Sequence, residues 1–174
     1  MGGQATPGYA SVAMVGEVST RPVRLPDDGA FLLSLYASTR PDLVALGLPA
    51  EQLDALLRMQ SEAQSRHYNA CYPGASHLVV TVAGEPCGRL WVDRTDTDIR
   101  IVDIAVLPTF RRSGLGTALV RTLLDEADAA RRTVRCHVAV GNEARHFWER
   151  LGFLASAQDE AYVAMEKVCA ISPR

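Results

Sequence analysis

The chain has 174 residues, of which 48% are apolar and 22% charged, and 18 Lys and Arg against 20 Asp and Glu give a net charge of −2. This length suits one domain with a full apolar core, and a near-neutral charge argues against a protein that binds the nucleic-acid backbone. No stretch approaches the roughly 20 apolar residues of a membrane span, and the first residues lack the features of a secretory signal. We therefore expect neither a nucleic-acid nor a membrane partner.

The cysteines bear on the cellular compartment. The four of them lie too far apart to form the close ligand pairs of a zinc site: Cys71, Cys87, Cys136 and Cys169. Free cysteine is among the most buried residue types. We expect reduced, mostly buried thiols, no metal site and a cytoplasmic protein.

The N-terminal third is predicted to contain one strand and two helices. The strand is expected over residues 17–25, and Asp28, beside a second aspartate, then offers an N-cap for a helix with apolar residues on one face. A second helix is expected over 50–70, after a loop bracketed by prolines. Residues 1–16 are rich in Gly, Ala, Ser and Thr and are expected to form a flexible tail before a single domain over 17–170.

After residue 75 the spacing of apolar residues changes from that of helices to that of strands. Runs over 77–82, 87–94 and 99–107, separated by turn residues, predict an antiparallel meander. A helix over 114–131 then separates two strands, which permits a parallel pair joined by a crossover, and a short helix and a hairpin close the chain. The sequence predicts an α/β fold with a mixed, mostly antiparallel sheet and helices on both faces.

The most informative segment joins the last strand of the meander to the next helix. It combines two arginines with two glycines at a helix start. Its full sequence is Arg111, Arg112, Ser113, Gly114, Leu115, Gly116 and Thr117. Unpaired amides and the helix dipole attract anions at such a start, and glycines let phosphates approach the backbone. The segment lacks the lysine of a P-loop and the third glycine of the dinucleotide-binding fingerprint. A pyrophosphate would suit it, although an ordinary turn with surface arginines is the alternative.

Two motifs resemble those of the GNAT superfamily of N-acetyltransferases. The pattern [Arg/Gln]-x-x-Gly-x-[Gly/Ala], filled by Arg111, Gly114 and Gly116, resembles the family's acetyl-CoA loop. The strand end that precedes it also resembles the strand end that precedes this loop in the family. Some forty residues later, the run from Asn142 to Phe153 resembles the signature Asn…Tyr-x-x-x-Gly-Phe. The resemblance covers about residues 20–168. It implies the GNAT fold, with one splayed parallel strand pair, and acetyl-CoA as co-substrate.

The resemblance also implies a set of cofactor-binding residues. In the family, the pantetheine arm lies in the gap between the splayed strands, so the amide of Val106 would face the thioester carbonyl. Asn142 would bond the pantetheine arm, or would instead cap a helix. The loop over 111–117 would hold the pyrophosphate. The complete implied set is Ile104, Val106, Arg111, Arg112, Ser113, Gly114, Leu115, Gly116, Thr117, Asn142 and Trp148.

One position departs from the family pattern. Trp148 stands where the family usually has a tyrosine that is thought to protonate the departing CoA thiolate, and an indole N–H is too weak an acid for that. Solvent or another hydroxyl, such as that of Tyr162 or Ser113, would serve instead, or a thiolate with a pKa of ~8.5 leaves unaided while Trp148 packs along the cofactor. Alternatively, the protein binds acetyl-CoA without efficient catalysis, or Trp148 is an ordinary core residue.

For the acceptor amine, the candidate catalytic residue is Asp103. It lies within an otherwise apolar strand, where a carboxylate must be hydrogen-bonded or have a raised pKa, and either state suits a proton acceptor that works through water. The alternative is a structural partner for an arginine or a helix terminus. Asp93, Glu62 and His67 are weaker candidates.

Three functions remain open from the sequence. The first is direct transfer of acetyl from acetyl-CoA to the amine of a small molecule or peptide. The second is a non-catalytic acyl-CoA-binding or regulatory domain of the same fold, and the third is a generic phosphate-binding module. The resemblance allows a homodimer, and the identity of the acceptor is open.

Overall fold

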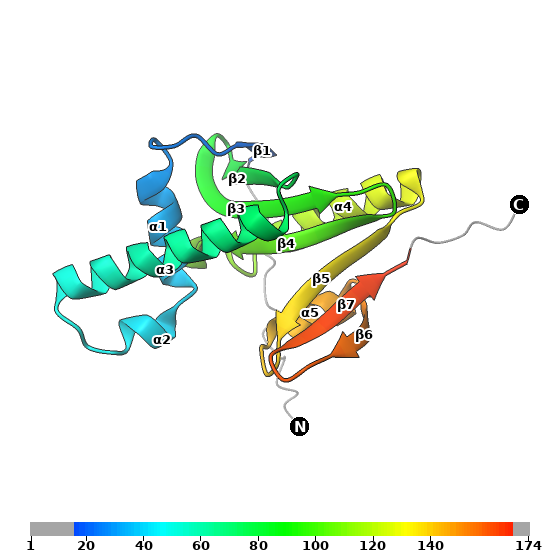
Figure 1. Cartoon of the computed structure of the whole chain (residues 1–174). Helices are drawn as coiled ribbons and strands as arrows, with labels where there is room; N and C mark the ends of the chain where they lie inside the picture. The colour runs from blue at the N-terminus through cyan, green and yellow to red at the C-terminus, as the bar shows by residue number, and fades with distance from the viewer. Residues whose placement is uncertain (1–15, 169–174) are drawn as a thin grey trace, which may run out of the picture.

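The computed structural model describes residues 16–168, which form a seven-stranded sheet with helices on both faces (Figure 1). The elements in chain order are β1 (Val18–Pro22), α1 (Gly29–Ser38), α2 (Pro41–Val44), α3 (Ala50–Cys71), β2 (Ser76–Val82), β3 (Glu85–Arg94), β4 (Asp98–Val106), the 3₁₀ turn η1 (Pro108–Phe110), α4 (Leu115–Ala130), β5 (Thr133–Ala139), α5 (Ala144–Arg150), β6 (Leu154–Gln158) and β7 (Tyr162–Lys167). In Figure 1, α1 and α3 lie in front of the sheet and α4 and α5 behind it. The predicted tail falls almost wholly outside the described residues, so the predicted domain boundaries stay a prediction.

The sheet confirms the predicted topology. Its strand order is β1-β2-β3-β4-β5-β7-β6, and the first four strands pair antiparallel as a meander. The pair β4–β5 is parallel, with α4 as its crossover, and the C-terminal hairpin adds β7 and β6 antiparallel. Two short elements were not predicted: α2, within the expected loop over 41–49, and the turn η1. Proline occupies the first position of each, where a helix needs no amide donor.

The parallel strands separate after four residue pairs. Their register runs from Asp98 opposite Thr133 to Ile101 opposite Cys136 and stops there, although both strands continue. At the same point β4 carries a bulge against β3, because Trp91 pairs with Asp103 while its neighbour pairs with Ile101. A bulge bends and twists its strand. The splayed pair is therefore confirmed, and Figure 1 shows β4 and β5 diverging.

The main core lies between the sheet and α4. The helix presents buried apolar residues at helical spacing: Leu115, Leu119, Val120, Leu123, Leu124 and Ala127. Alternate residues of β5 meet them, because Val134, Cys136 and Val138 are buried in the same cluster. Each large aliphatic side chain buried there contributes about 1.5–3 kcal/mol, and this packing fixes where α4 begins.

The other face of the sheet is packed differently. A small apolar cluster of Tyr36, Leu43 and Leu57 joins α1, α2 and the first half of α3. The second half of α3 meets the sheet through polar and aromatic side chains: Gln64 bonds Arg89, and Tyr68 packs edge-on against Trp91. On this face the sheet therefore carries polar groups instead of a continuous apolar core.

The start of α1 differs in detail from the prediction. Asp28 occupies the N-cap position but caps no helix amide. Its carboxylate instead accepts two hydrogen bonds from the Arg21 guanidinium, at 2.7 and 2.8 Å, and one from the amide of Arg24, at 2.7 Å. These donors lower the pKa of Asp28 to about 2. The aspartate thus joins the end of β1 to the start of α1.

Candidate functional site

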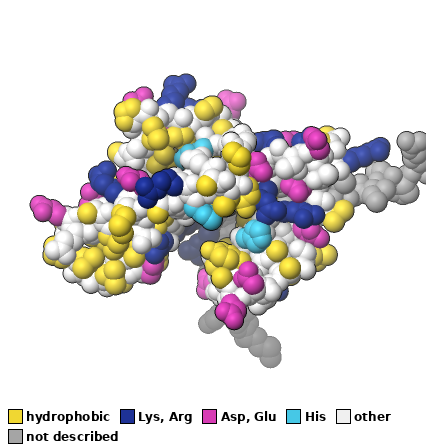
Figure 2. Space-filling view, in the orientation of Figure 1, with side chains coloured by type: hydrophobic (Ala, Val, Ile, Leu, Met, Phe, Trp, Pro, Cys, Tyr) yellow, Lys and Arg dark blue, Asp and Glu magenta, His cyan; other side chains and the backbone are white. Residues whose placement is uncertain are grey.

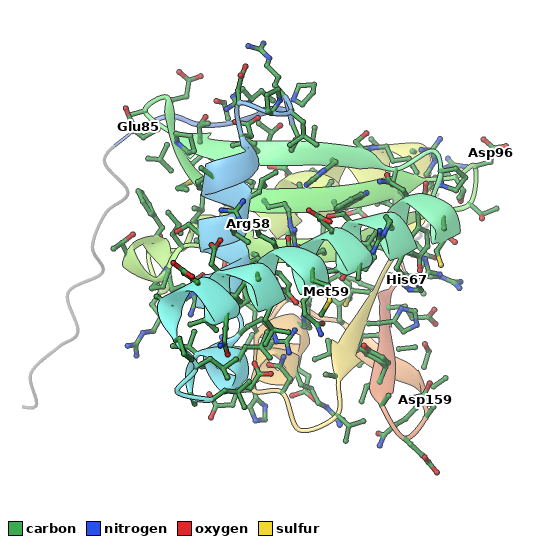
Figure 3. The ribbon with its side chains drawn as sticks, turned by 60° about the vertical axis from the view of Figure 1, so that its left-hand side comes forward. Arg58, Met59, His67, Glu85, Asp96 and Asp159 are labelled. Carbon is green, nitrogen blue, oxygen red and sulfur yellow. The ribbon has the colours of Figure 1, made fainter. Side chains whose placement is uncertain are left out.

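A cavity of about 570 Å³ lies where β4 and β5 separate, and we call it the β4–β5 cavity. Its walls come from the separated parts of both strands, the C-terminal half of α3, the start of α5 and the turn between β6 and β7. Figure 2 shows a hollow between the lobe that carries α2 and α3 and the lobe that carries β6 and β7, with histidine side chains at its border. In Figure 3, His67 lies on the side of α3 toward β5 and β7, and Asp159 lies at the tip of the β6–β7 turn.

Main-chain amides face this gap. The amide of Leu107 donates to the Cys87 carbonyl of β3 at 2.9 Å. Because the N–H groups of successive residues point to opposite edges of a strand, those of Ile104 and Val106 point toward β5. The β4–β5 pairing has already ended at Ile101, so within residues 16–168 these two amides have no strand partner. They are fixed donors, as a developing oxyanion requires.

The glycine-bearing loop after β4 is open to a ligand. Gly114 is the N-cap of α4 and has a φ of +90°, a conformation that favours glycine, and a Cβ there would meet nothing within 4 Å. The first intrahelical bond of α4 runs from the Ala118 amide to the Gly114 carbonyl, so the amides of Gly116 and Thr117 precede it without helix partners. Arg112 is exposed, also with a positive φ, +59°. The geometry is that of an anion-binding helix start.

Two further polar side chains of the loop, those of Arg111 and Ser113, bond to the protein itself. The Arg111 guanidinium donates through Nε to the Val106 carbonyl at 2.9 Å and through Nη2 to the carbonyl and hydroxyl of Ser38. The Ser113 hydroxyl donates to the Phe110 carbonyl at 2.7 Å. Arg111 thus joins the end of β4, the loop and the end of α1. Its predicted contact with phosphate stays a prediction, as do those of the other loop residues.

Asn142 and Trp148 both line the β4–β5 cavity. The Asn142 Oδ1 accepts from the Ala144 amide at 2.8 Å, in the turn just before α5, whose N-cap is Glu143. Among residues 16–168 the Asn142 Nδ2 has no partner and can donate to a ligand. Trp148 is 5% exposed and packs edge-on against Phe147 and Phe153, both with ring centroids 5.1 Å away. The indole is therefore a core residue that also forms part of the cavity wall, and its packing along the cofactor stays a prediction.

Asp103 lies in the cavity wall as one half of an ion pair. Its Oδ2 accepts from Arg89 Nε at 2.9 Å and is 2.8 Å from Arg89 Nη2, which also donates to Gln64 of α3 at 3.1 Å. The Arg89 side chain is 4% exposed and that of Asp103 19%. Within residues 16–168, Oδ1 of Asp103 has no hydrogen bond, so the carboxylate keeps acceptor capacity. The arginine partner considered as an alternative role is present, and the catalytic role stays a prediction.

Several residues that line the cavity or contact its lining were not assigned to the site from the sequence. Arg89 is the clearest, because an arginine inside the apolar run of β3, one strand away from an aspartate inside β4, is a detectable signal. Tyr68 of α3 and Tyr72, which follows the last residue of that helix, could not be placed from the sequence, since only the leucines of the helix were assigned to a face. Burial raises the pKa of Tyr68, which keeps its hydroxyl protonated. Arg100 and His137 also line the cavity.

His137 is held in one neutral form. Arg100 Nη1 lies 3.3 Å from His137 Nδ1, and because an arginine only donates, Nδ1 accepts and the ring proton is on Nε2. Burial and the Arg100 charge lower the pKa of His137. Its ring packs edge-on against Tyr162, with ring centroids 6.5 Å apart. Of the two hydroxyls named as substitutes for the missing tyrosine, Tyr162 lines the cavity and Ser113 does not.

Residues 16–168 bring no three His, Cys, Asp or Glu side chains together in an arrangement that could hold a metal ion. Within the same residues, no helix is both long and apolar enough to span a bilayer.

Comparisons with known proteins bear on this geometry. The chain is 32% identical over 68 residues to the uncharacterized N-acetyltransferase CgeE of Bacillus subtilis, an alignment that covers 38% of this chain and 26% of that protein. The chain thus spans about a quarter of the length of this relative.

Solved structures share the fold. An acetyltransferase from Thermus thermophilus superposes with a TM-score of 0.65 at 16% identity, over 90% of this chain and 99% of that one. The PaiA N-acetyltransferase from Thermoplasma acidophilum, in complex with coenzyme A, superposes with a TM-score of 0.64 at 13% identity, over 87% and 99%. A sequence model of the GNAT acetyltransferase family matches residues 41–153, a stretch that contains the splayed strands and the glycine loop, and the chain belongs to this family.

Proposed function

We propose that this protein is an acetyl-CoA-dependent N-acetyltransferase that transfers acetyl directly to an amine of a small molecule or peptide. The observation that carries the proposal is the parallel strand pair that opens after Ile101, with the free amides of Ile104 and Val106 along its edge. Membership of the GNAT acetyltransferase family supports acyl transfer, and the coenzyme A in the related PaiA structure supports the cofactor.

The cofactor would extend from the gap to the start of α4. Its pantetheine arm would bond the exposed edge of β4 and the free Nδ2 of Asn142, with Trp148 packed alongside. Its pyrophosphate would accept from the amides of Gly116 and Thr117 at the positive end of α4. The exposed Arg112 would add positive charge beside the pyrophosphate, and Arg111 holds the loop against β4 through a hydrogen bond to the Val106 carbonyl.

In the reaction, the amine nitrogen attacks the thioester carbonyl carbon. A C–N bond forms, and the amide of Val106 stabilises the negative charge on the carbonyl oxygen. The C–S bond then breaks, and the electron pair leaves with the sulfur as the CoA thiolate. The amine proton passes to Asp103 directly or through one water, because Oδ1 has no competing donor.

The leaving group would depart without a protein acid. Trp148 replaces the tyrosine of the family pattern, and a thiolate of pKa ~8.5 is a tolerable leaving group. Of the two hydroxyls considered from the sequence, Tyr162 is the one that lines the same cavity. A Tyr162→Phe variant with an unchanged rate at all pH values would support unaided departure, and a large loss of rate would assign the acid to Tyr162.

Thermal shift and thiol release test the proposal in two steps. Acetyl-CoA should stabilise the protein, whereas ATP and NAD should not, because only the former matches the loop and the gap. Release of CoA thiol with a panel of alkylamines, amino acids and peptides then tests transfer. Stabilisation by ATP instead of acetyl-CoA would favour a generic phosphate-binding module and overturn the proposal.

The second candidate is a non-catalytic acyl-CoA-binding domain, and Trp148 is the observation that favours it. This function predicts the same stabilisation by acetyl-CoA but no thiol release with any acceptor up to about pH 9. The homodimer and the cytoplasmic location stay predictions, to be checked by the mass in solution and by cell fractionation.

A further inference from the structure

A second cavity, of about 440 Å³, lies on the opposite flank of α3, and the acetyl transfer proposed above makes no use of it. We call it the α1–α3 cavity, because α1 and α3 form its walls over the floor of β2 and β3. Arg58, which lines it, lies on the opposite side of α3 from His67, which lines the β4–β5 cavity (Figure 3). Its volume falls within the range of small-molecule sites, roughly 300–1,000 Å³.

The wall formed by α3 is polar. The residues that line the cavity recur at the spacing of one helix face: Arg58, Ser61, Glu62, Ser65, Arg66 and Asn69. A helix packed on a sheet usually presents apolar side chains at this spacing. Here the polar side chains border a cavity that is open to solvent along α3, so they can bind a ligand that enters there.

The floor contains buried nitrogen atoms with unused hydrogen-bonding capacity. Arg89 is 3% exposed; its Nε and Nη2 bond Asp103 and Gln64, and its Nη1 has no partner within the described part of the chain. Trp91 is 1% exposed, and His77 stacks on it with ring centroids 3.9 Å apart. Trp91 Nε1 and His77 Nε2 are buried without a partner. Buried polar atoms in proteins are nearly always hydrogen-bonded, so these two unsatisfied atoms at one cavity point to a ligand.

The charges and hydrogen-bond donors around the cavity bear on the class of ligand. Of its three arginines, Arg58 pairs with Asp54 and Arg89 with Asp103, whereas Arg66 has no ion pair among residues 16–168. Glu62, one helix turn from Arg66, is the one carboxylate in the lining and also has no ion pair among these residues, so the formal charges of these side chains balance. N–H donors remain in excess, and an ionised carboxylate is a group that only accepts. Burial and the nearby Arg89 charge lower the pKa of His77 to about 4, so this imidazole adds no charge at neutral pH.

The remaining wall is apolar. Leu32 and Leu33 of α1, together with Leu25 before it, face the polar side of α3 across the cavity. We propose that the α1–α3 cavity binds a small organic carboxylate, with its carboxylate toward Arg66 and Arg89 and its apolar body against Leu32 and Leu33. The guanidinium fork is suited to a carboxylate, which it can bind through two parallel hydrogen bonds.

Tryptophan fluorescence can report this binding directly. The sequence has two tryptophans, Trp91 in this cavity and Trp148 in the β4–β5 cavity, so Trp148→Phe leaves Trp91 as the single fluorophore. This variant is titrated with hexanoate and benzoate, and with hexanamide and benzamide as neutral counterparts, in the absence of acetyl-CoA. We expect a saturable change in emission and a Kd at least about tenfold lower for at least one acid than for its amide. Calorimetry on the unmodified protein provides the same comparison without the substitution.

Matched arginine variants locate the site. Arg66→Gln should raise the Kd of the bound acid at least about tenfold, because the charged donor is lost. Arg121→Gln makes the same change on the exposed side of α4 and should leave the Kd unchanged. Equal affinities for every acid and its amide, no effect of Arg66→Gln, or an equal effect of Arg121→Gln would each overturn the proposal. Tighter binding of benzyl phosphate than of benzoate would also overturn it, in favour of a phosphate ester.

The outcome is independent of the proposed acetyl transfer. Binding is measured without cofactor or acceptor, so a protein that lacks acetyltransferase activity could still bind the carboxylate. Conversely, if no carboxylate binds in the α1–α3 cavity, release of CoA thiol from acetyl-CoA is still expected.

Discussion

The two faces of the sheet are built from the same strands but serve different purposes. Behind the sheet, α4 packs six buried apolar residues against Val134, Cys136 and Val138, and no charged side chain interrupts this contact. In front, α3 meets the sheet through Gln64 and Tyr68, over an arginine and an aspartate, with a cavity on each flank. Alternation along β3 separates the two environments, because Leu90 and Val92 join the apolar cluster whereas Arg89 and Trp91 contact α3. One face therefore supplies most of the apolar packing, and the other carries the polar groups of the candidate site.

The largest expected effect is on stability at the α4 face. Leu123 is 3% exposed, and Leu123→Ala should lower the free energy of unfolding by about 3 kcal/mol, because the removed atoms leave a cavity in close packing. Leu53→Ala is the matched change on α3, where the leucine is only half-buried, and should cost about 1 kcal/mol. Urea unfolding measures both. Equal costs would mean that the two faces contribute alike to stability.

The next effect is on catalysis at the α3 face. Asp103→Asn should lower kcat/KM for acetyl transfer about 100-fold, because an amide cannot accept the amine proton. The loss should shrink as the pH rises and more of the acceptor is already deprotonated. Steady-state rates from about pH 6 to 9 check this. An unchanged rate across that range would leave Asp103 with only the structural role of pairing with Arg89.

The contributions of Arg89 and Asp103, which form the ion pair beneath α3, to the free energy of unfolding should be strongly coupled. Arg89→Met should lower stability by about 2 kcal/mol, because it leaves the Asp103 carboxylate without its partner in a partly buried site. The double variant Arg89→Met/Asp103→Leu should recover most of this loss, since it leaves no charge behind. Chemical unfolding of the two single variants and the double variant forms the cycle. Additive losses would show that the pair is not coupled.

The smallest effect is at the junction of β1 and α1, and it depends on pH. The pKa of Asp28 falls from 3.8 to about 2 on folding, so the folded state favours the carboxylate. The stabilisation is therefore fully present above about pH 5 and is lost as the pH falls toward 2. Because Arg21 is one-third exposed, we expect Asp28→Asn to cost about 1.5 kcal/mol at pH 7. Thermal unfolding should show that variant and wild type converge near pH 2; a constant difference would contradict the ion pair.

Local sequence patterns predicted much of this fold. The apolar spacing of residues 115–127 predicted α4 and its buried face, and the three strand runs with turn residues between them predicted the meander. The glycine loop was recognised because Gly114 and Gly116 follow a buried strand within a short segment. Each of these features depends on residues that are close together along the chain.

The contacts of the candidate site depend instead on residues that are far apart along the chain. Asp103 was recognised as a carboxylate in an apolar strand, but its pairing with Arg89 depends on the register of β3 against β4, which includes a bulge. Arg111 was expected at the phosphates, yet its guanidinium bonds Ser38, which is 73 residues away.

The sequence by itself thus determined the order of elements, the family motifs and the glycine loop, because these follow from spacing and from residue type. Only the tertiary structure decided where β4 and β5 separate, which side chains line the two cavities and which charges are paired. Those features depend on the register of the strands, on the bulge in β4 and on the packing of α3 across the sheet. Each of these joins residues that are far apart along the chain, and no short-range pattern records such contacts.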